Sequence, residues 1–402
     1  MNDTSAVSRA LKGSVLYLGL AAVFLAGCFI SKEFLTIGNQ RDVLWQVSSN
    51  GILAVGMTLV ILTAGIDLSV GSLLSLCSVV CAMLLMDREW TRATTLAVPS
   101  MTAFGGLAGG GLGWWIFQSL GRKRRVVLGL VTSTLGAALL LLLGLSQVSS
   151  GFSVLLVLLA VPPVGMVMGL ISGFIIARGK LQPFIVTLAM MISAVGLAKF
   201  VAGKGGQIHA VYTEGTSAHA PAAFEFLASN LVVFGQELVP VPALFFIGCV
   251  AAAAFLLNRT RLGRYVYAVG GNEETARLSG ININQVKITV YAVSGFLSGL
   301  AAVLYCAQYT QGKPDAGVMK ELDAIAAVVI GGTSLRGGRG RIMGTLVGVL
   351  IFGYLSNFLN LGKVPSEFQD ILKGTVIVAA VLLQEGTLVR WLRYGARTKS
   401  AE

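Results

Sequence analysis

The polar segment from Gly270 to Ile281 carries the most suggestive chemistry in this sequence. Asn272 is a residue type that caps helices, Arg277 lies one turn after Glu273, and Gly280 is a stop signal. The pattern predicts an amphipathic helix of about two turns, too short to be stable alone. It suits a groove on a partner protein, with a plain surface connector as the alternative. The residues expected to make that contact are Asn272, Glu273, Glu274, Ala276, Arg277, Leu278, Ser279 and Gly280.

Two apolar runs are broken by glycines and polar residues. One break holds Asp67 between Gly65 and Gly71, and the other extends from Gly331 to Gly338. Irregular backbone within a membrane is tolerated where it lines a cavity or packs inside protein. We therefore expect both breaks to face a central pathway, with Asp67 and Ser334 capping helix ends beside it. Tight turns at the membrane surface are the alternative.

Sequence patterns for catalysis, metal binding and nucleotide binding are missing. No Gly-x4-Gly-Lys-Ser/Thr loop, His-Glu-x-x-His pair, Gly-x-Ser-x-Gly elbow or Cys-x-x-Cys pair occurs. His209 and His219 lie in a polar stretch without a paired cysteine or carboxylate spacing, which favours solvated surface over a metal site. The sequence therefore predicts no catalytic residue, no metal and no cofactor, and no ATP binding through a P-loop of its own.

The amino-acid composition indicates the environment in which these segments fold. Of the 402 residues 55% are apolar, a further 50 are glycine, and only 12% are charged, about half the usual share. The net charge of +12 is spread in short groups between apolar runs, such as Arg122–Arg125, rather than gathered beside aromatic residues. This distribution excludes a nucleic-acid-binding class and indicates a polytopic protein in a lipid membrane.

The predicted fold class is all-α, a transmembrane helix bundle of about twelve helices with broken helices, forming one transmembrane domain over residues 1–402. A spanning helix needs about 20 mostly apolar residues. By that criterion the predicted helices are Ser14–Ile30, Val47–Gly65, Val70–Met86, Thr95–Phe117, Val126–Leu145, Ser153–Ala177, Pro183–Ala202, Val241–Leu257, Ile288–Tyr309, a shorter run Leu322–Gly332, Ile342–Leu361 and Phe368–Leu383.

The basic residues orient this bundle. If the N-terminus is cytoplasmic and every helix crosses, about two-thirds of the 30 basic residues fall in inside loops. The expected topology has both termini in the cytoplasm, one long outside segment (203–240) and one long inside segment (258–287). Because the inside segment is polar and charged, we expect it to do more than connect two helices.

Four segments carry a family resemblance. Ala64–Gly71 (AGIDLSVG), Gln182–Leu188 (QPFIVTL), Gly270–Ile281 (GGNEETARLSGI) and Leu322–Gly340 (LDAIAAVVIGGTSLRGGRG) resemble the permease subunit of bacterial ABC sugar importers of the ribose/xylose type, in the family's order. Residues 87–151 depart from the family pattern as an inserted pair of helices.

The resemblance implies a division of labour. The chain would be no enzyme; a separate ABC ATPase subunit would bind ATP and would dock at the coupling loop 258–287, and a periplasmic sugar-binding protein would deliver a monosaccharide. A second permease copy, as a homodimer, would complete the pathway in the bacterial inner membrane. A permease for branched-chain amino acids or nucleosides, and a stand-alone secondary transporter, are the alternatives. The residues assigned to the pathway are Gly65, Asp67, Ser69, Gly71, Pro183, Phe184, Thr187, Asp323, Gly331, Gly332, Thr333 and Ser334.

Overall fold

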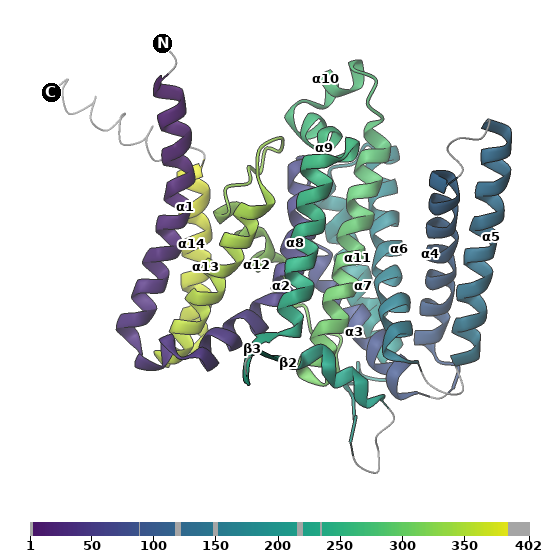
Figure 1. The fold of residues 1–402 in the computed structure, drawn as a ribbon, viewed down its shortest axis with the longest axis horizontal. Helices are drawn as coiled ribbons and strands as arrows, with labels where there is room; N and C mark the ends of the chain where they lie inside the picture. Colours follow the sequence, from purple (N-terminus) through teal and green to yellow (C-terminus); the bar gives the residue numbers. More distant parts are fainter. Residues whose placement is uncertain are drawn as a thin grey trace. The chain divides into compact units, whose positions relative to one another are not determined.

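The computed structural model describes residues 3–87, 89–116, 122–147, 152–214, 220–233 and 235–384, and this part of the chain is almost entirely helical (Figure 1). Short pieces complete it: β1 (His209–Ala210), β2 (Asn230–Val233), β3 (Gln236–Pro240), β4 (Gln311–Gly312) and the 3₁₀ turns Lys32–Leu35 and Ala222–Ala228. The α-helices are α1 (Asp3–Ile30), α2 (Ile37–Leu62), α3 (Val70–Met86), α4 (Arg92–Ile116), α5 (Arg122–Gln147), α6 (Val154–Gly179), α7 (Pro183–Ala202), α8 (Val241–Arg259), α9 (Arg261–Gly271), α10 (Glu273–Leu278), α11 (Ile283–Tyr309), α12 (Lys320–Ile330), α13 (Ile342–Leu361) and α14 (Ser366–Gln384).

Each of the twelve predicted helices coincides with an α-helix, and the bounds of α3, α7 and α13 agree to the residue. Among the described residues, seven helices are long and apolar enough to cross a membrane by themselves. The exceptions include α12, whose 11 residues extend only roughly 16 Å, about half of the hydrocarbon layer. Helix α12 is too short to make the crossing expected there by itself.

The chain divides into two compact units, each assembled from distant stretches of sequence. Unit 1 contains residues 1–65, 231–286 and 322–402, and unit 2 contains residues 66–230 and 287–321. In unit 1, α2 packs on α8 and α13. Paired amides of Asn39 and Asn357 join α2 to α13 at one level, and the hydroxyls of Thr58 and Thr345 do so at another, 2.7 Å apart. These polar contacts between helices are buried or partly buried, so both partners are satisfied away from water.

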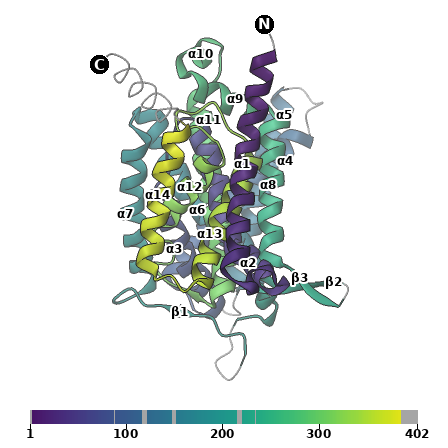
Figure 2. The same cartoon turned by 90° about the vertical axis from the view of Figure 1, so that its left-hand side faces the viewer.

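The ends of unit 1 differ in what they carry. The first helix begins, and α14 ends, at the end of the unit where α10 projects beyond α8 and α9 (Figure 2). Strands β2 and β3 pair at the opposite end. All three features that the topology assigned to the inside loops and termini therefore share one end of this unit.

Unit 2 is organised around α3, which packs on α4, α6 and α7 and is buried over almost its whole length. Helix α6 continues through Pro162 and Pro163. It meets α11 so closely that a Cβ at Gly165 would overlap the carbonyl oxygen of Gly295. Short strands β1 and β4 pair antiparallel at the C-terminal end of α11.

Helices α4 and α5 form a hairpin whose closest contacts are made by glycines. Gly105 of α4 lies against the backbone of Gly136 of α5, and Gly109 lies against Thr132. The outward faces stay exposed, with Leu107, Leu112, Leu130, Leu135, Leu139 and Leu142 all uncovered. Glycines at these contacts let the two helices approach closely.

Candidate functional site

The helix predicted at 270–281 is present in unit 1 as α10, and it has the predicted caps. The side chain of Asn272 accepts a hydrogen bond from the backbone nitrogen of Thr275 at 2.8 Å, and Gly280 ends the element with φ +79°. Arg277 lies 3.4 Å from Glu274, an exposed pair of little weight for stability. Leu278 is 82% exposed. A short, capped helix that presents charges and a bare leucine has the features of a docking element.

A second helix, α9, leads directly into α10 and fixes its base. The hydroxyl of Thr260 caps α9 by accepting from Gly263 N at 3.2 Å, and Val266 and Val269 are buried on one face. Helix α9 was not predicted from the sequence. Its signal was the Thr260 cap followed by apolar residues three and four positions apart, Leu262, Val266 and Val269.

Helix α9 packs on the second break, the Gly331–Arg341 segment. The Tyr267 hydroxyl donates to the carbonyl oxygen of Gly340 at 3.0 Å, and Gly338 N donates to the carbonyl oxygen of Leu62, the last residue of α2, at 2.9 Å. A Cβ at Gly270 would overlap that same Leu62 oxygen. Burial raises the pKa of the Tyr267 hydroxyl, so it keeps its proton and remains a donor. We call these backbone contacts of α9, the Gly331–Arg341 segment and α2 the glycine junction.

Ser334, in the Gly331–Arg341 segment, does not cap a helix end as predicted. Ser334 N donates to Arg339 O at 2.8 Å and its hydroxyl accepts from Arg336 N at 3.3 Å, so the side chain closes a turn within the segment. Helix α13 begins later, with Arg341 at its N-cap position. The prediction that Ser334 caps a helix end was wrong, because a serine accepts equally well from a turn amide and from a helix amide.

The same segment reverses the chain between two helices of unit 1. Gly331, the residue that follows α12, lies against Gly344 of α13, and Ala327 lies against Gly348, so the two helices run antiparallel in close contact. Gly332 adopts φ +85°. Thr333 is fully buried, and its hydroxyl has no partner among the described residues.

In unit 2, Asp67 is buried at the start of the first break. Its carboxylate accepts from Ser69 N at 3.0 Å, from the Ser69 hydroxyl at 2.6 Å and from the Ser294 hydroxyl of α11 at 2.9 Å. The bond to Ser69 N stabilises the turn that precedes α3. Asp67 therefore does not bond to the free amides in the first turn of α3. Its bond to the Ser294 hydroxyl joins the turn before α3 to α11.

The predicted pathway residues of α7 differ in how far their side chains are buried. Thr187 is fully buried, and its hydroxyl donates to the carbonyl oxygen of Ile66, beside Asp67, at 3.1 Å. Pro183 is the first residue of α7, and the Phe184 side chain is 50% exposed. The structure thus brings Thr187 to the first break and leaves Phe184 on the surface of the unit.

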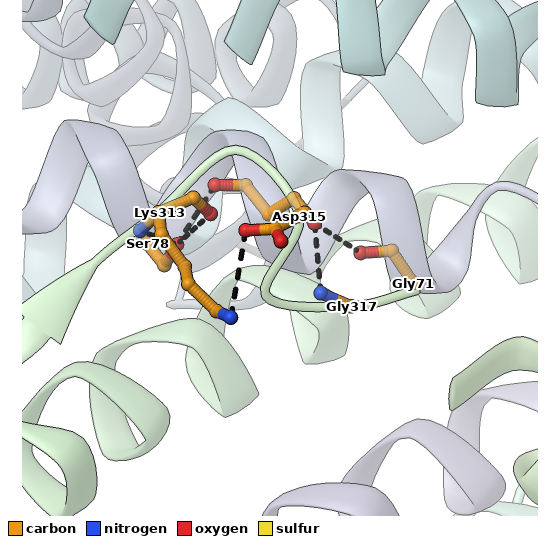
Figure 3. Close-up of polar contacts among 6 residues, drawn as sticks. Gly71, Ser78, Lys313, Asp315 and Gly317 are labelled. Atoms are coloured by element: carbon orange, nitrogen blue, oxygen red, sulfur yellow. Dashed lines mark hydrogen bonds and ion pairs between the residues drawn. The ribbon is translucent and has the colours of Figure 1, made fainter. Parts of the chain in front are cut away.

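A third irregular segment, Thr310–Met319, was not predicted from the sequence. It follows α11 and lies along α3, held by two buried serines (Figure 3). Gly317 N donates to the Ser75 hydroxyl at 2.8 Å, Lys313 N donates to the Ser78 hydroxyl at 3.3 Å, and that hydroxyl donates to Lys313 O at 3.2 Å. Two signals were in the sequence: serines every third residue (Ser69, Ser72, Ser75, Ser78) and the string GKPDAG at 312–317.

Comparisons with known proteins identify the family of this chain. Residues 118–381 match the family described as branched-chain amino acid transport system, permease component. The ribose import permease protein RbsC of Escherichia coli K12 is 38% identical over 356 residues, 88% of each chain, and RbsC of Bacillus subtilis 168 is 36% identical over 91% of each. The xylose transport system permease protein XylH of Escherichia coli K12 is 34% identical over 88% of this chain and 86% of its own. No solved structure matches.

The chain belongs to this permease family. The resemblance expected from its four segments is confirmed, and so is the all-α, multi-pass architecture. His219 and the side chains of the basic Arg122–Arg125 group cannot be compared with the predictions: residue 219 is not among the described residues, and the side chains at 122–125 are not described.

The predicted pathway residues of the permease fall in both units. Gly65, Asp323 and the Gly331–Ser334 stretch belong to unit 1, whereas Asp67, Ser69, Gly71 and the α7 residues belong to unit 2. Within unit 2, Gly71 lies in contact with the backbone of Gly317, so the first break and the Thr310–Met319 segment are packed together. No group of three or more potential metal ligands occurs among the described residues.

Proposed function

We propose that this permease is the membrane-spanning subunit of an ATP-driven importer and that its cargo is a monosaccharide of the ribose and xylose class. The observation that carries the proposal is the 34–38% identity with ribose and xylose permeases over 88% of the chain. The sequence lacks a P-loop, which agrees with an ATPase on a separate subunit.

The docking element for that ATPase is α10. Its exposed charges and the bare Leu278 side chain suit a groove on a soluble partner, where an apolar anchor and a charged rim are the usual composition. Movement of α10 reaches the membrane part through α9 and the glycine junction, since these contacts are between backbones and have little slack.

The remaining parts of the importer follow from the same family. A periplasmic sugar-binding protein supplies the cargo, and a second permease copy completes the pathway in the inner membrane. Both termini and α10 lie in the cytoplasm in this proposal, which agrees with the charge distribution of the loops. The inserted residues 87–151 contribute a peripheral hairpin, α4 with α5, rather than a part of the pathway.

Reconstitution tests the proposal directly. Proteoliposomes that contain the permease with its ATPase and binding protein should accumulate labelled ribose or xylose only with ATP, and collapse of the ion gradients should leave uptake unchanged. Uptake that needs an ion gradient and no ATP would identify a secondary transporter. ATP-driven uptake of leucine without sugar uptake would identify the branched-chain amino acid class.

The docking role of α10 has its own test. The double substitution Glu274→Lys and Arg277→Glu should abolish ATP-driven uptake and binding of the ATPase, while the protein still inserts and folds. Gln285→Lys, an exposed change on the neighbouring start of α11, is the matched control and should behave as wild type. Normal uptake by the double variant would exclude α10 as the docking element.

Orientation is tested with single cysteines. Glu225→Cys should react with a membrane-impermeant maleimide from outside intact cells, and Ser279→Cys should react only after the membrane is opened. Both positions are exposed, and the wild-type chain with its five free cysteines supplies the background. The reverse pattern would invert the proposed topology.

A further inference from the structure

The Thr310–Met319 segment carries a group of side chains that have no role in the proposed function. Lys313 Nζ lies 3.5 Å from an Asp315 oxygen, and the Asp315 side chain is 66% exposed (Figure 3). An exposed pair of this kind adds little to stability. The backbone below it, in contrast, is fixed by the fully buried hydroxyls of Ser75 and Ser78. A rigid backbone that carries exposed charges is suited to binding.

Two aromatic rings lie at the end of α11 that leads into this segment. Tyr305 and Tyr309, one turn apart on α11, have ring centroids 4.6 Å apart, and Tyr309 is 43% exposed. Lys320 Nζ lies 5.9 Å from the Tyr305 ring centre, and Gln311 follows Tyr309 by two positions. The group therefore combines an apolar ring face with an amide, an ammonium and a carboxylate.

We propose that Tyr309, Gln311, Lys313 and Asp315 form a contact site for the monosaccharide at the outer mouth of the permease. A sugar has an apolar face of C–H groups and a rim of hydroxyls, each able to donate and to accept. The Tyr309 ring suits the face, the Asp315 carboxylate accepts from one hydroxyl, and the Lys313 ammonium donates to its neighbour. This inference rests on the proposed sugar cargo.

Charge balance favours a neutral ligand over an ion. Residues 311–321 contain two lysines and two acids, so their net charge is zero. A sugar diol can bridge the Lys313–Asp315 pair and leave it intact. A zwitterionic amino acid would instead compete with the pair, because its own ammonium and carboxylate are attracted to the same two groups.

The position of the site agrees with entry from outside. Helix α11 has 27 residues, so its ends lie roughly 40 Å apart, more than the thickness of the hydrocarbon layer. It starts close in sequence to α10, which the proposed function places in the cytoplasm, and the site lies at its other end. A sugar released from the binding protein would therefore meet the Thr310–Met319 segment early in its passage.

A protection experiment on the full-length permease in liposomes tests the site without a binding protein or ATPase. A cysteine replacing Val318, which is 64% exposed beside the site, should react more slowly with a maleimide when ribose or xylose is present and at the unchanged rate with leucine. Asp315→Asn, which removes one charge-assisted contact, and Tyr309→Ala, which removes the ring contact, should each weaken that protection about fivefold to tenfold. A cysteine replacing the exposed Glu214 is the matched control and should show no protection.

The outcomes separate this inference from the proposed function. Absent protection, or protection that persists in both variants, would overturn the site even if the complete importer moves sugar. Sugar uptake that is normal in Asp315→Asn and Tyr309→Ala would overturn it as well. If the variants instead lose binding-protein attachment and ATPase stimulation in parallel with uptake, the segment docks the binding protein and the sugar site is refuted. Failure of the wild-type importer to move any sugar would refute the proposed function itself.

Discussion

The Gly331–Arg341 segment of unit 1 and the Thr310–Met319 segment of unit 2 fix irregular chain in different ways. The first is held by backbone contacts: Gly338 N on Leu62 O, and Gly270 pressed against that same oxygen. The second has close backbone contacts of its own, Gly317 on Gly71 and Gly312 on Ser78, and adds the hydroxyls of Ser75 and Ser78. Contacts between backbones have no rotamers to absorb movement, so both segments are rigid. The comparison indicates that unit 2 supplements its backbone contacts with buried serine hydroxyls.

The largest expected effect is at the glycine junction. Gly270→Ala places a methyl group on the Leu62 carbonyl oxygen, where no flexible side chain can yield, so we expect a loss of about 3 kcal/mol or failure to accumulate. Gly271→Ala is the matched control, because a Cβ there meets nothing within 4 Å. Thermal unfolding in detergent and ATP-driven uptake would measure both. Equal behaviour of the two variants would show that the junction is not a rigid link.

The serine support should be weaker but still measurable. Ser75→Ala leaves the buried Gly317 N without its acceptor, which costs about 1–3 kcal/mol. Ser72→Ala is the control, since the Ser72 hydroxyl donates only to Ser69 O among the bonds seen here. We expect a lower melting temperature for Ser75→Ala alone. Identical melting temperatures would remove Ser75 from the support of the segment.

Backbone conformation at Gly332 gives a smaller effect. A Cβ there meets nothing, so the only penalty for Gly332→Ala is the left-handed φ of +85°, about 1–2 kcal/mol. Gly332→Asn should cost less, because asparagine tolerates this region better than alanine. A melting series of the two variants checks the order. If asparagine were the worse substitution, a steric cause would have to replace the conformational one.

The smallest effect should come from the hydroxyl that joins α9 to the Gly331–Arg341 segment. Tyr267→Phe removes the donor to Gly340 O and keeps the ring, at a cost of about 1 kcal/mol. Because burial raises the pKa of Tyr267, the wild-type hydroxyl remains protonated at neutral pH and the difference should not vary between pH 6 and 8. Melting of both proteins across that range tests the statement, and a pH-dependent difference would contradict it.

Helices were predictable from the sequence because the apolar layer sets their length. The bounds of α3, α7 and α13 follow from apolar runs that end at glycine, proline or charged residues. The α10 helix was predictable because Asn272 and Gly280 act locally, within one or two turns.

Contacts between distant segments were not predictable in the same way. Ser75 and Ser78 look like the other serines of α3, and only the fold shows that the Thr310–Met319 segment lies on them. Ser334 was misassigned because its preference for capping does not specify which amide it will meet. Glycines such as Gly270 signal close approach, but the sequence does not name the partner.

The glycine-lined hairpin of α4 and α5 has a consequence for how such a chain can grow. In water, removing a covering hairpin would expose apolar surface at a large hydrophobic cost. In a bilayer the exposed surface meets lipid tails that are equally apolar, so only packing between helices is lost. Because Gly105 and Gly136 let the two helices pack on each other, the hairpin can enter the membrane as a self-contained pair. Membrane proteins can thus carry peripheral helix pairs with little effect on the rest of the bundle, and a deletion of residues 92–147 should be tolerated far better than a deletion of equal length elsewhere in unit 2.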